Sequence, residues 1–204
     1  MERDGIQNIL NRKDLRAILG HCQYGVHRYV SRQISYITVL RDPVERVLSM
    51  YYFHKLVQEK HGSLEGIRMP SGMCLEQYVN NPLYSEVTNG QTRRLSGVGF
   101  KSHICPRSAL KQAKENIDQH FTVVGLTERF AETIELLKQS FGWQLDVPVC
   151  HKNENLTKPT TRSHFSETLE IIQQANSLDI ELYNYATKLF EDRISQHGNK
   201  VSKG

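Results

Sequence analysis

YITVLRDPVERVLSMYY, residues 36–52, contains the change of pattern that decides the fold. Its first five residues, YITVL, are apolar and rich in β-branched and aromatic side chains, which predicts a buried strand in a parallel sheet covered on both faces. Arg41-Asp42-Pro43 follows; Asp is a favourable helix N-cap, and Pro suits the first helical position because its missing N–H costs nothing there. Apolar residues then recur at helical spacing, so we predict a strand, a sharp turn and a helix up to about residue 58.

The alternation of strands and helices continues on both sides of this stretch. FTVVGL, residues 121–126, predicts a second buried strand, and Thr127 is expected to cap the next helix, which ends at Gly142. Further helices are predicted at residues 12–19, 74–79 and 107–120, with a short one within 89–97 and one or two near the C-terminus through about residue 194. This order predicts an α/β fold, and residues 1–204, which contain no linker-like segment, are expected to form a single domain.

Composition narrows the classes of function. The 204 residues include 26 Lys and Arg against 22 Asp and Glu, a net charge of +4 that is too small to indicate a nucleic-acid partner. Residues 1–102 carry 14 basic against 9 acidic side chains, so an anionic ligand is expected to meet the first half. No stretch reaches the roughly 20 apolar residues of a membrane span. The four cysteines form no CxxC pair, and we expect no metal site.

Arg41 is the first candidate for chemistry. Ligands of open α/β sheets bind at the carboxyl ends of strands, and Arg41 ends the first strand. The helix starting at Pro43 directs its positive dipole end to the same place, and Ser49, two turns on, can add a hydroxyl donor. A forked cation, a helix N-terminus and a hydroxyl suit a phosphate group. The alternative is that Arg41 pairs with Asp42 or Glu45 and that Ser49 is an ordinary helix residue.

Five segments occur in an informative order: GHCQYGVH (20–27), RDPVERVLSMYY (41–52), NGQTRRLSG (89–97), VVGLTERFAETIELLKQSFGW (123–143) and HKNENLTKPT (151–160). Over about residues 10–195 the chain thereby resembles the P-loop sulfotransferases, and most closely their carbohydrate branch, which is related to the heparan sulfate 2-O- and 6-O-sulfotransferases. The resemblance implies a three-layer α/β sandwich with a central parallel sheet of the P-loop type. It also implies transfer of a sulfuryl group from 3′-phosphoadenosine 5′-phosphosulfate (PAPS) to an acceptor hydroxyl, in this branch on a carbohydrate.

The resemblance further implies roles for single residues. Arg41 and Ser49 would bind the 3′-phosphate of PAPS. Lys158 would lie in the loop that closes over the nucleotide. His21 would be the general base, because histidine titrates near working pH, and His27 is the alternative.

A polar and cationic cluster occupies the segment 89–97. Gln91 and Arg93 are candidates for binding a carboxylate or sulfate group of a sugar acceptor. The alternative for this cluster is a salt-bridged helix surface. Arg46, in the helix after Pro43, either supports the phosphate site or is solvated.

One element of the family is absent from the sequence. The family opens with a strand and a phosphate-binding loop whose Lys stabilises the leaving phosphate, and no such loop occurs here. We therefore expect a domain without its first strand and loop, in which the strand at 36–40 is one neighbour short. A catalytically silent binding module is the alternative function, whereas a kinase-like nucleotide enzyme is disfavoured because no Walker Lys is present. A bacterial protein of this kind would be cytoplasmic, and an animal one would lie in the Golgi lumen behind an N-terminal anchor.

Overall fold

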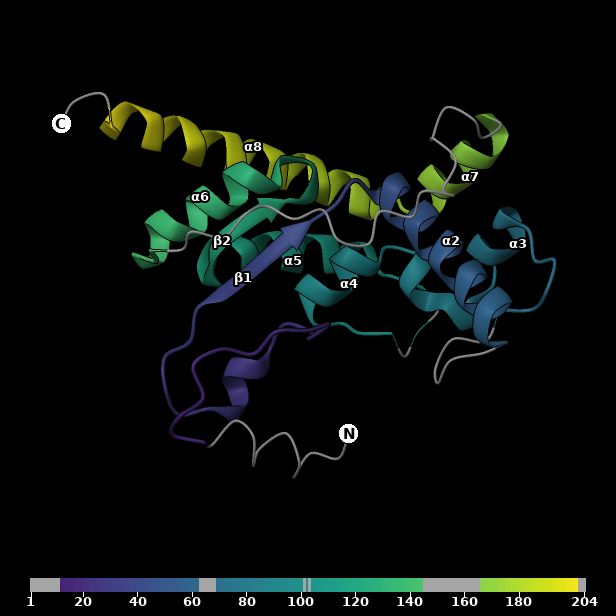
Figure 1. The fold of residues 1–204 in the computed structure, drawn as a ribbon, viewed down its shortest axis with the longest axis horizontal. Coiled ribbons are helices and arrows are strands. Elements are labelled where there is room, and N and C mark those ends of the chain that lie inside the picture. Colours follow the sequence, from purple (N-terminus) through teal and green to yellow (C-terminus); the bar gives the residue numbers. More distant parts are fainter. Residues whose placement is uncertain (1–11, 63–68, 101, 103, 145–165, 202–204) are drawn as a thin grey trace.

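The computed structural model of the chain describes residues 12–62, 69–100, 102, 104–144 and 166–201 (Figure 1). Within these residues the sheet has two parallel strands, β1 (Tyr36–Leu40) and β2 (Phe121–Leu126), whose last paired residues are Leu40 and Leu126. Both predicted strands are confirmed. The fold is α/β with a small parallel sheet, which is smaller than the central sheet of the expected three-layer sandwich.

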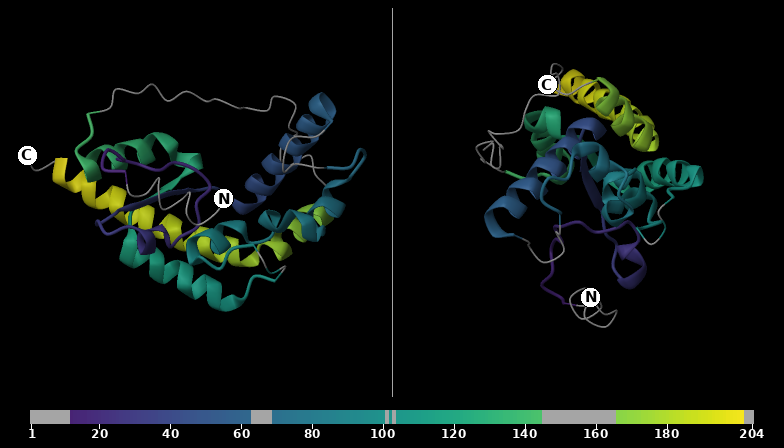
Figure 2. Two further views of the ribbon diagram at one scale, coloured as in Figure 1. Left: turned by 90° about the horizontal axis from the view of Figure 1, so that it is seen from below. Right: turned by 90° about the vertical axis from the view of Figure 1, so that its right-hand side faces the viewer.

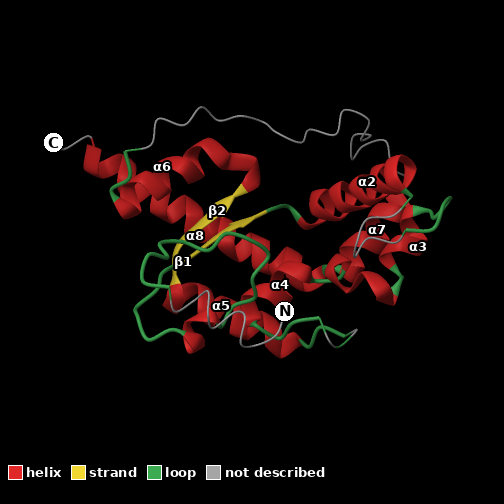
Figure 3. Ribbon diagram, turned by 60° about the horizontal axis from the view of Figure 1, so that its bottom comes forward, coloured by secondary structure: helices red, strands yellow, loops and turns green. Residues whose placement is uncertain are grey.

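Helices pack around this strand pair. The described part of the chain contains α2 (Pro43–His61), α3 (Leu75–Val79), α4 (Gly90–Ser96), α5 (Arg107–His120), α6 (Phe130–Phe141), α7 (Ser166–Ala175) and α8 (Ser177–Val201), with short 3-10 turns η1 (Val26–Tyr29), η2 (Pro82–Val87) and η3 (Thr127–Arg129). Helices α2, α3 and α7 gather at one end of the molecule, away from the C-terminal end of α8 (Figure 2). Helix α6 lies on one side of the strands and α5 on the other (Figure 3).

Two local predictions are wrong. Residues 12–19 form no helix; Ile18 and Leu19 are 46% and 96% exposed, so the apolar face has no surface to pack on, and a helix this short does not persist without packing. Thr127 does not cap α6, because its hydroxyl donates to the carbonyl of Leu40 at 3.1 Å and the helix begins only at Phe130. The other predicted helices are confirmed within a few residues.

The buried apolar side chains form two clusters. The first joins β2 to α5, α6 and α8 and includes Val123, Val124, Leu126, Ile117, Leu136, Leu182 and Phe190. The second lies between α2, α3 and α7 and includes Val47, Leu48, Tyr78, Val79 and Ile172. Leu40, the last residue of β1, belongs to the first cluster and Val47 of α2 belongs to the second, so the turn after β1 connects the two.

Strand β1 is covered less completely than predicted. Ile37 and Val39 are 40% and 39% exposed, whereas Val123, the partner of Ile37 in β2, is fully buried. The reason is that α5, α6 and α8 pack mainly against β2, so this face of β1 is covered less among the described residues. The expectation that this strand is one neighbour short stays a prediction.

Helix α6 approaches β2 closely at Gly125. The hydroxyl of Thr133 accepts a hydrogen bond from the Leu126 N–H (3.0 Å) and donates to the Leu126 carbonyl (3.1 Å). A Cβ atom on residue 125 would collide with the Thr133 side chain, so the close approach requires glycine. This contact fixes α6 against the end of β2, whose last residue pairs with Leu40 of β1.

Candidate functional site

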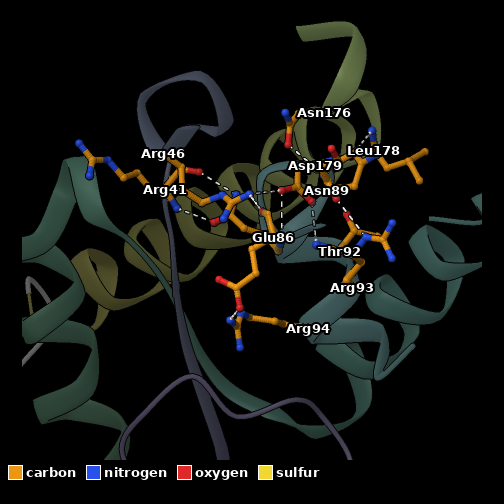
Figure 4. Close-up of polar contacts among 12 residues, drawn as sticks. Arg41, Arg46, Glu86, Asn89, Thr92, Arg93, Arg94, Asn176, Leu178 and Asp179 are labelled. Atoms are coloured by element: carbon orange, nitrogen blue, oxygen red, sulfur yellow. Dashed lines mark hydrogen bonds and ion pairs between the residues drawn. The ribbon is translucent and has the colours of Figure 1, made fainter. Parts of the chain in front are cut away.

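Arg41 directly follows β1, and one side chain of α4 holds its backbone. Gln91 Oε1 accepts from the Arg41 N–H, and Gln91 Nε2 donates to the Arg41 carbonyl, both at 2.9 Å. Gln91 therefore bonds both backbone groups of Arg41, as a neighbouring strand would in a β-sheet. These bonds fix the direction in which the Arg41 side chain leaves the backbone. The side chain itself points away from Asn89 and Asp179 (Figure 4).

The Arg41 guanidinium lies along the first turn of α2. Arg41 Nη2 is 3.9 Å from Glu45 Oε2, and the two side chains are 34% and 33% exposed. Glu45 and Ser49 are four residues apart on one face of α2, and Ser49 is half-buried. An ion pair this long and exposed contributes little to stability. The pairing of Arg41 with Glu45, which the sequence offered as the alternative, therefore leaves the guanidinium able to bind an anion.

The N-terminus of α2 offers fewer free N–H donors to an anion than the sequence predicted. Asp42 Oδ1 accepts from the Glu45 N–H at 2.9 Å, and the Asp42 carbonyl accepts from the Arg46 N–H at 2.8 Å. Pro43 has no N–H to offer. In this described first turn, the Val44 N–H is the donor that remains to face a bound anion.

The Arg46 side chain lies largely inside the protein, between α2 and α8. Its Nη2 donates to the Glu86 carbonyl at 2.7 Å and lies 3.6 Å from Asp179 Oδ2, and the Arg46 side chain is only 15% exposed. A Cβ on Gly90 would come within 2.8 Å of this guanidinium, so glycine makes room for it. The solvated alternative for Arg46 is therefore wrong, and its support of the phosphate site stays a prediction.

The N-termini of α4 and α8 exchange caps. Asp179, in the first turn of α8, accepts from the N–H groups of Gln91 (3.0 Å) and Thr92 (2.7 Å). In return, Asn89 Oδ1 accepts from the N–H groups of Leu178 (3.0 Å) and Asp179 (3.1 Å) (Figure 4). Asp179 is fully buried, and two positive helix ends and Arg46 compensate its charge.

The two candidate bases lie in different environments. His21 is exposed, and its carbonyl accepts from Arg94 Nη1 at 2.5 Å. His27 is half-buried beside the first residue of β1; its Nδ1 lies 2.8 Å from the Tyr36 hydroxyl, and its ring stacks on His120 with centroids 5.5 Å apart. Burial, followed by the charges of His120 and Arg28, holds the pKa of His27 below its usual value. His27 thus lies at the amino end of β1, whereas Arg41 lies at its carboxyl end.

Arg93 and Arg94 have separate roles in the structure. Arg93 is 0% exposed, and it donates to the carbonyls of Thr88 (3.0 Å), Gly99 (3.2 Å) and Ser102 (2.9 Å), so it ties the turn after α4 to the helix start. Arg94 joins the carbonyl of His21 to the carboxylate of Glu86. Since Arg46 donates to the Glu86 carbonyl, contacts lead from His21 to α2 through Arg94 and Glu86.

Three remaining expectations concern Lys158, a metal site and a membrane span. Lys158 lies outside the described residues. The described residues contain no group of His, Cys, Asp and Glu side chains that could hold a metal ion. In the same part of the chain, every helix is too short or too polar to cross a membrane.

Asp179 and Asn89 are cap residues near the candidate site whose partners sequence reasoning missed. Both stand at helix starts, in Asn89-Gly90 and in Asn176-Ser177-Leu178-Asp179, and such residues predict caps. A local pattern does not say which helix a side chain caps. Here each cap serves the other helix, 87 to 90 residues away.

Comparison with known proteins places the chain among carbohydrate sulfotransferases. Residues 10–204 match the family described as Galactose-3-O-sulfotransferase. Heparan-sulfate 6-O-sulfotransferase 2 of Gallus gallus is 30% identical over 188 residues, and that of Homo sapiens is 32% identical over 192 residues. Uronyl 2-sulfotransferase of Homo sapiens is 28% identical over 180 residues.

These alignments cover 80% of this chain in each case but only 46%, 30% and 44% of the respective relatives. The chain therefore spans less than half the length of these three proteins. The family match extends over nearly all of the chain and includes the turn after β1 and both exchanged helix caps. On this match, the chain belongs to the galactose-3-O-sulfotransferase family of carbohydrate sulfotransferases.

Proposed function

We propose that the protein transfers a sulfuryl group from PAPS to a hydroxyl of a carbohydrate. The observation that carries this proposal is the Arg41 turn: its backbone is bonded twice by Gln91, and its guanidinium lies beside Glu45 in the first turn of α2. A preorganised cation at the carboxyl end of a parallel strand suits a phosphate dianion. The three-layer sandwich is part of the same proposal, and parallel strand pairing with α5 and α6 on either side supports it.

The 3′-phosphate of PAPS is the group assigned to this turn. Arg41 supplies the charge, the Val44 N–H supplies a backbone donor at the helix end, and Ser49 supplies a hydroxyl one turn beyond Glu45. Gln91 acts on the backbone of Arg41 rather than on a ligand. Lys158 keeps its proposed place in the loop over the nucleotide.

His21 is the proposed general base. The acceptor oxygen attacks sulfur, the bond from sulfur to the 5′-phosphate oxygen breaks, and the acceptor proton passes to the imidazole. The exposure of His21 supports this choice, as does its connection to α2 through Arg94 and Glu86. His27 is less suitable, because one ring nitrogen contacts Tyr36 at the opposite end of β1.

The acceptor is proposed to be an acidic polysaccharide. Relatives are named for heparan sulfate and for uronyl groups, whose sulfates or carboxylates suit an arginine fork. Arg94, whose side chain is 20% exposed, is better placed for this role than fully buried Arg93. The relatives are animal proteins, and of the two compartments considered they favour the Golgi lumen.

Calorimetry with two nucleotides tests the phosphate assignment. Adenosine 3′,5′-bisphosphate should bind more tightly than adenosine 5′-monophosphate. Arg41→Ala should lower the affinity for the bisphosphate by at least about tenfold. Transfer of labelled sulfate from PAPS to a desulfated heparan chain then tests turnover. Binding without transfer would indicate the silent binding module, and equal affinity for the two nucleotides would refute the site.

A further inference from the structure

We propose that α8 is the positioning element of the phosphate site, through two of its residues, Asp179 and Tyr183. The two residues are four apart, so they lie on one face of the helix. Each reaches the end of β1 through one intermediate side chain, and the two paths arrive on opposite sides of the Arg41–Asp42 peptide. The inference rests on the proposed function, because it assigns a cause to the orientation of Arg41.

The first path runs from Asp179 through Gln91. The buried carboxylate of Asp179 accepts from the Gln91 N–H at 3.0 Å and so fixes the first turn of α4. The Gln91 side chain then bonds both backbone groups of Arg41 at 2.9 Å. Because Gln91 is only 8% exposed, its amide has little freedom to leave this position.

The second path runs from Tyr183 through Glu128. The Tyr183 hydroxyl donates to Glu128 Oε2 at 2.9 Å, and Glu128 Oε1 accepts from the Asp42 N–H at 2.9 Å. One carboxylate thus joins α8 to the peptide that follows Arg41. Asp42 is also the N-cap of α2, so this path fixes the helix start as well.

Together the paths determine where the Arg41 guanidinium can lie. Both backbone groups of Arg41 and the N–H of Asp42 are bonded to side chains that α8 orients. A rotation of about 20° at this backbone would move a guanidinium about 6 Å away by about 2 Å, enough to lose a bidentate phosphate contact. The structure thereby assigns the positioning of a residue early in the chain to a helix near its end.

Three variants test the proposal by calorimetry with adenosine 3′,5′-bisphosphate and adenosine 5′-monophosphate. Gln91→Leu breaks the first path and should weaken bisphosphate binding about tenfold, whereas Tyr183→Phe breaks the second and should weaken it about threefold. Monophosphate binding should stay unchanged in both, since both paths end at the turn that is assigned to the 3′-phosphate. Gln112→Leu is the matched control, because exposed Gln112 bonds to Asn116 of its own helix, and it should change neither affinity.

A double variant separates positioning from a general structural effect. Arg41→Ala with Gln91→Leu should bind bisphosphate no more weakly than Arg41→Ala alone, because Gln91 acts through Arg41. A folded Gln91→Leu protein that keeps the wild-type preference for the 3′-phosphate would overturn the inference and leave the proposed function intact. Equal weakening of both nucleotides would also overturn it, and a wild-type protein without any preference would overturn the proposed function itself.

Discussion

Replacing Asp179 by Asn tests how strongly the exchanged caps hold the fold. Asn keeps the size of the side chain but offers one acceptor oxygen where Asp offers two. In the native protein those oxygens accept from the Gln91 and Thr92 N–H groups and lie 3.6 Å from Arg46 at the nearest. Whichever way the amide turns, one backbone N–H then faces an NH2 group, and Arg46 loses its buried counter-ion.

The magnitude follows from these contacts. An orphaned buried N–H costs about 1 to 3 kcal/mol, and removing one partner of a buried ion pair costs about 3 to 5 kcal/mol. Because Arg46 keeps its bond to the Glu86 carbonyl, the lower end applies, and we expect a loss of about 3 kcal/mol in the free energy of unfolding. With a urea dependence near 2 kcal/mol per molar, the unfolding midpoint should fall by about 1.5 M.

Urea unfolding followed by circular dichroism measures this shift. The matched control is Glu181→Gln, two residues further along α8, where Glu181 pairs with Arg107 on the surface and the cost should stay below about 0.5 kcal/mol. Asp179→Asn with Arg46→Met should cost less than the two single variants added together, by about 1 kcal/mol. A midpoint for Asp179→Asn within about 0.3 M of the wild type, or strict additivity with Arg46→Met, would refute the buried compensation described above.

Three further predictions follow from other contacts. Burial lowers the pKa of both His27 and His54 below the unfolded value near 6.5, so the unfolded chain binds more protons than the folded protein. The free energy of unfolding should therefore fall as pH drops through about 6.5, by up to about 1.4 kcal/mol per pH unit for each histidine. Urea midpoints that stay flat between pH 7.5 and 5 would contradict this. Gly125→Ala should cost about 2 kcal/mol through its collision with Thr133, and Thr133→Ser should recover part of that loss in a thermal melt. Glu45→Gln should tighten binding of adenosine 3′,5′-bisphosphate about threefold at low salt by removing the carboxylate beside Arg41, and calorimetry that shows weaker binding would argue against a phosphate there.

The sequence was sufficient where a local pattern determines the structure. The change from YITVL to Asp42-Pro43 predicted both the strand and the helix start, because β-branched residues and caps act within a few positions. It also placed Arg41 at a strand end. Residues 12–19 show the limit: their helical spacing is real, but the apolar face has no partner surface.

The supports of the site could not be predicted in the same way. Thr127 and Asn89 are the residue types that cap helices, yet Thr127 bonds to β1 and Asn89 caps α8. The charge of Arg93 suggested an exposed ligand site, but the buried guanidinium donates its hydrogen bonds to three backbone carbonyls. In each case tertiary packing decides the partner of the side chain, and composition and periodicity do not predict tertiary packing.

The exchanged caps also have a consequence for biosynthesis. Helix α4 has seven residues, too few to persist alone, and its first turn is completed by a carboxylate 88 residues later in the chain. At a translation rate of about 5 to 20 residues per second, Asp179 is made about 4 to 18 s after Gln91. A nascent chain therefore emerges with the Arg41 turn unsupported, and nucleotide binding should arise only after α8 has left the ribosome, as one of the last events of folding.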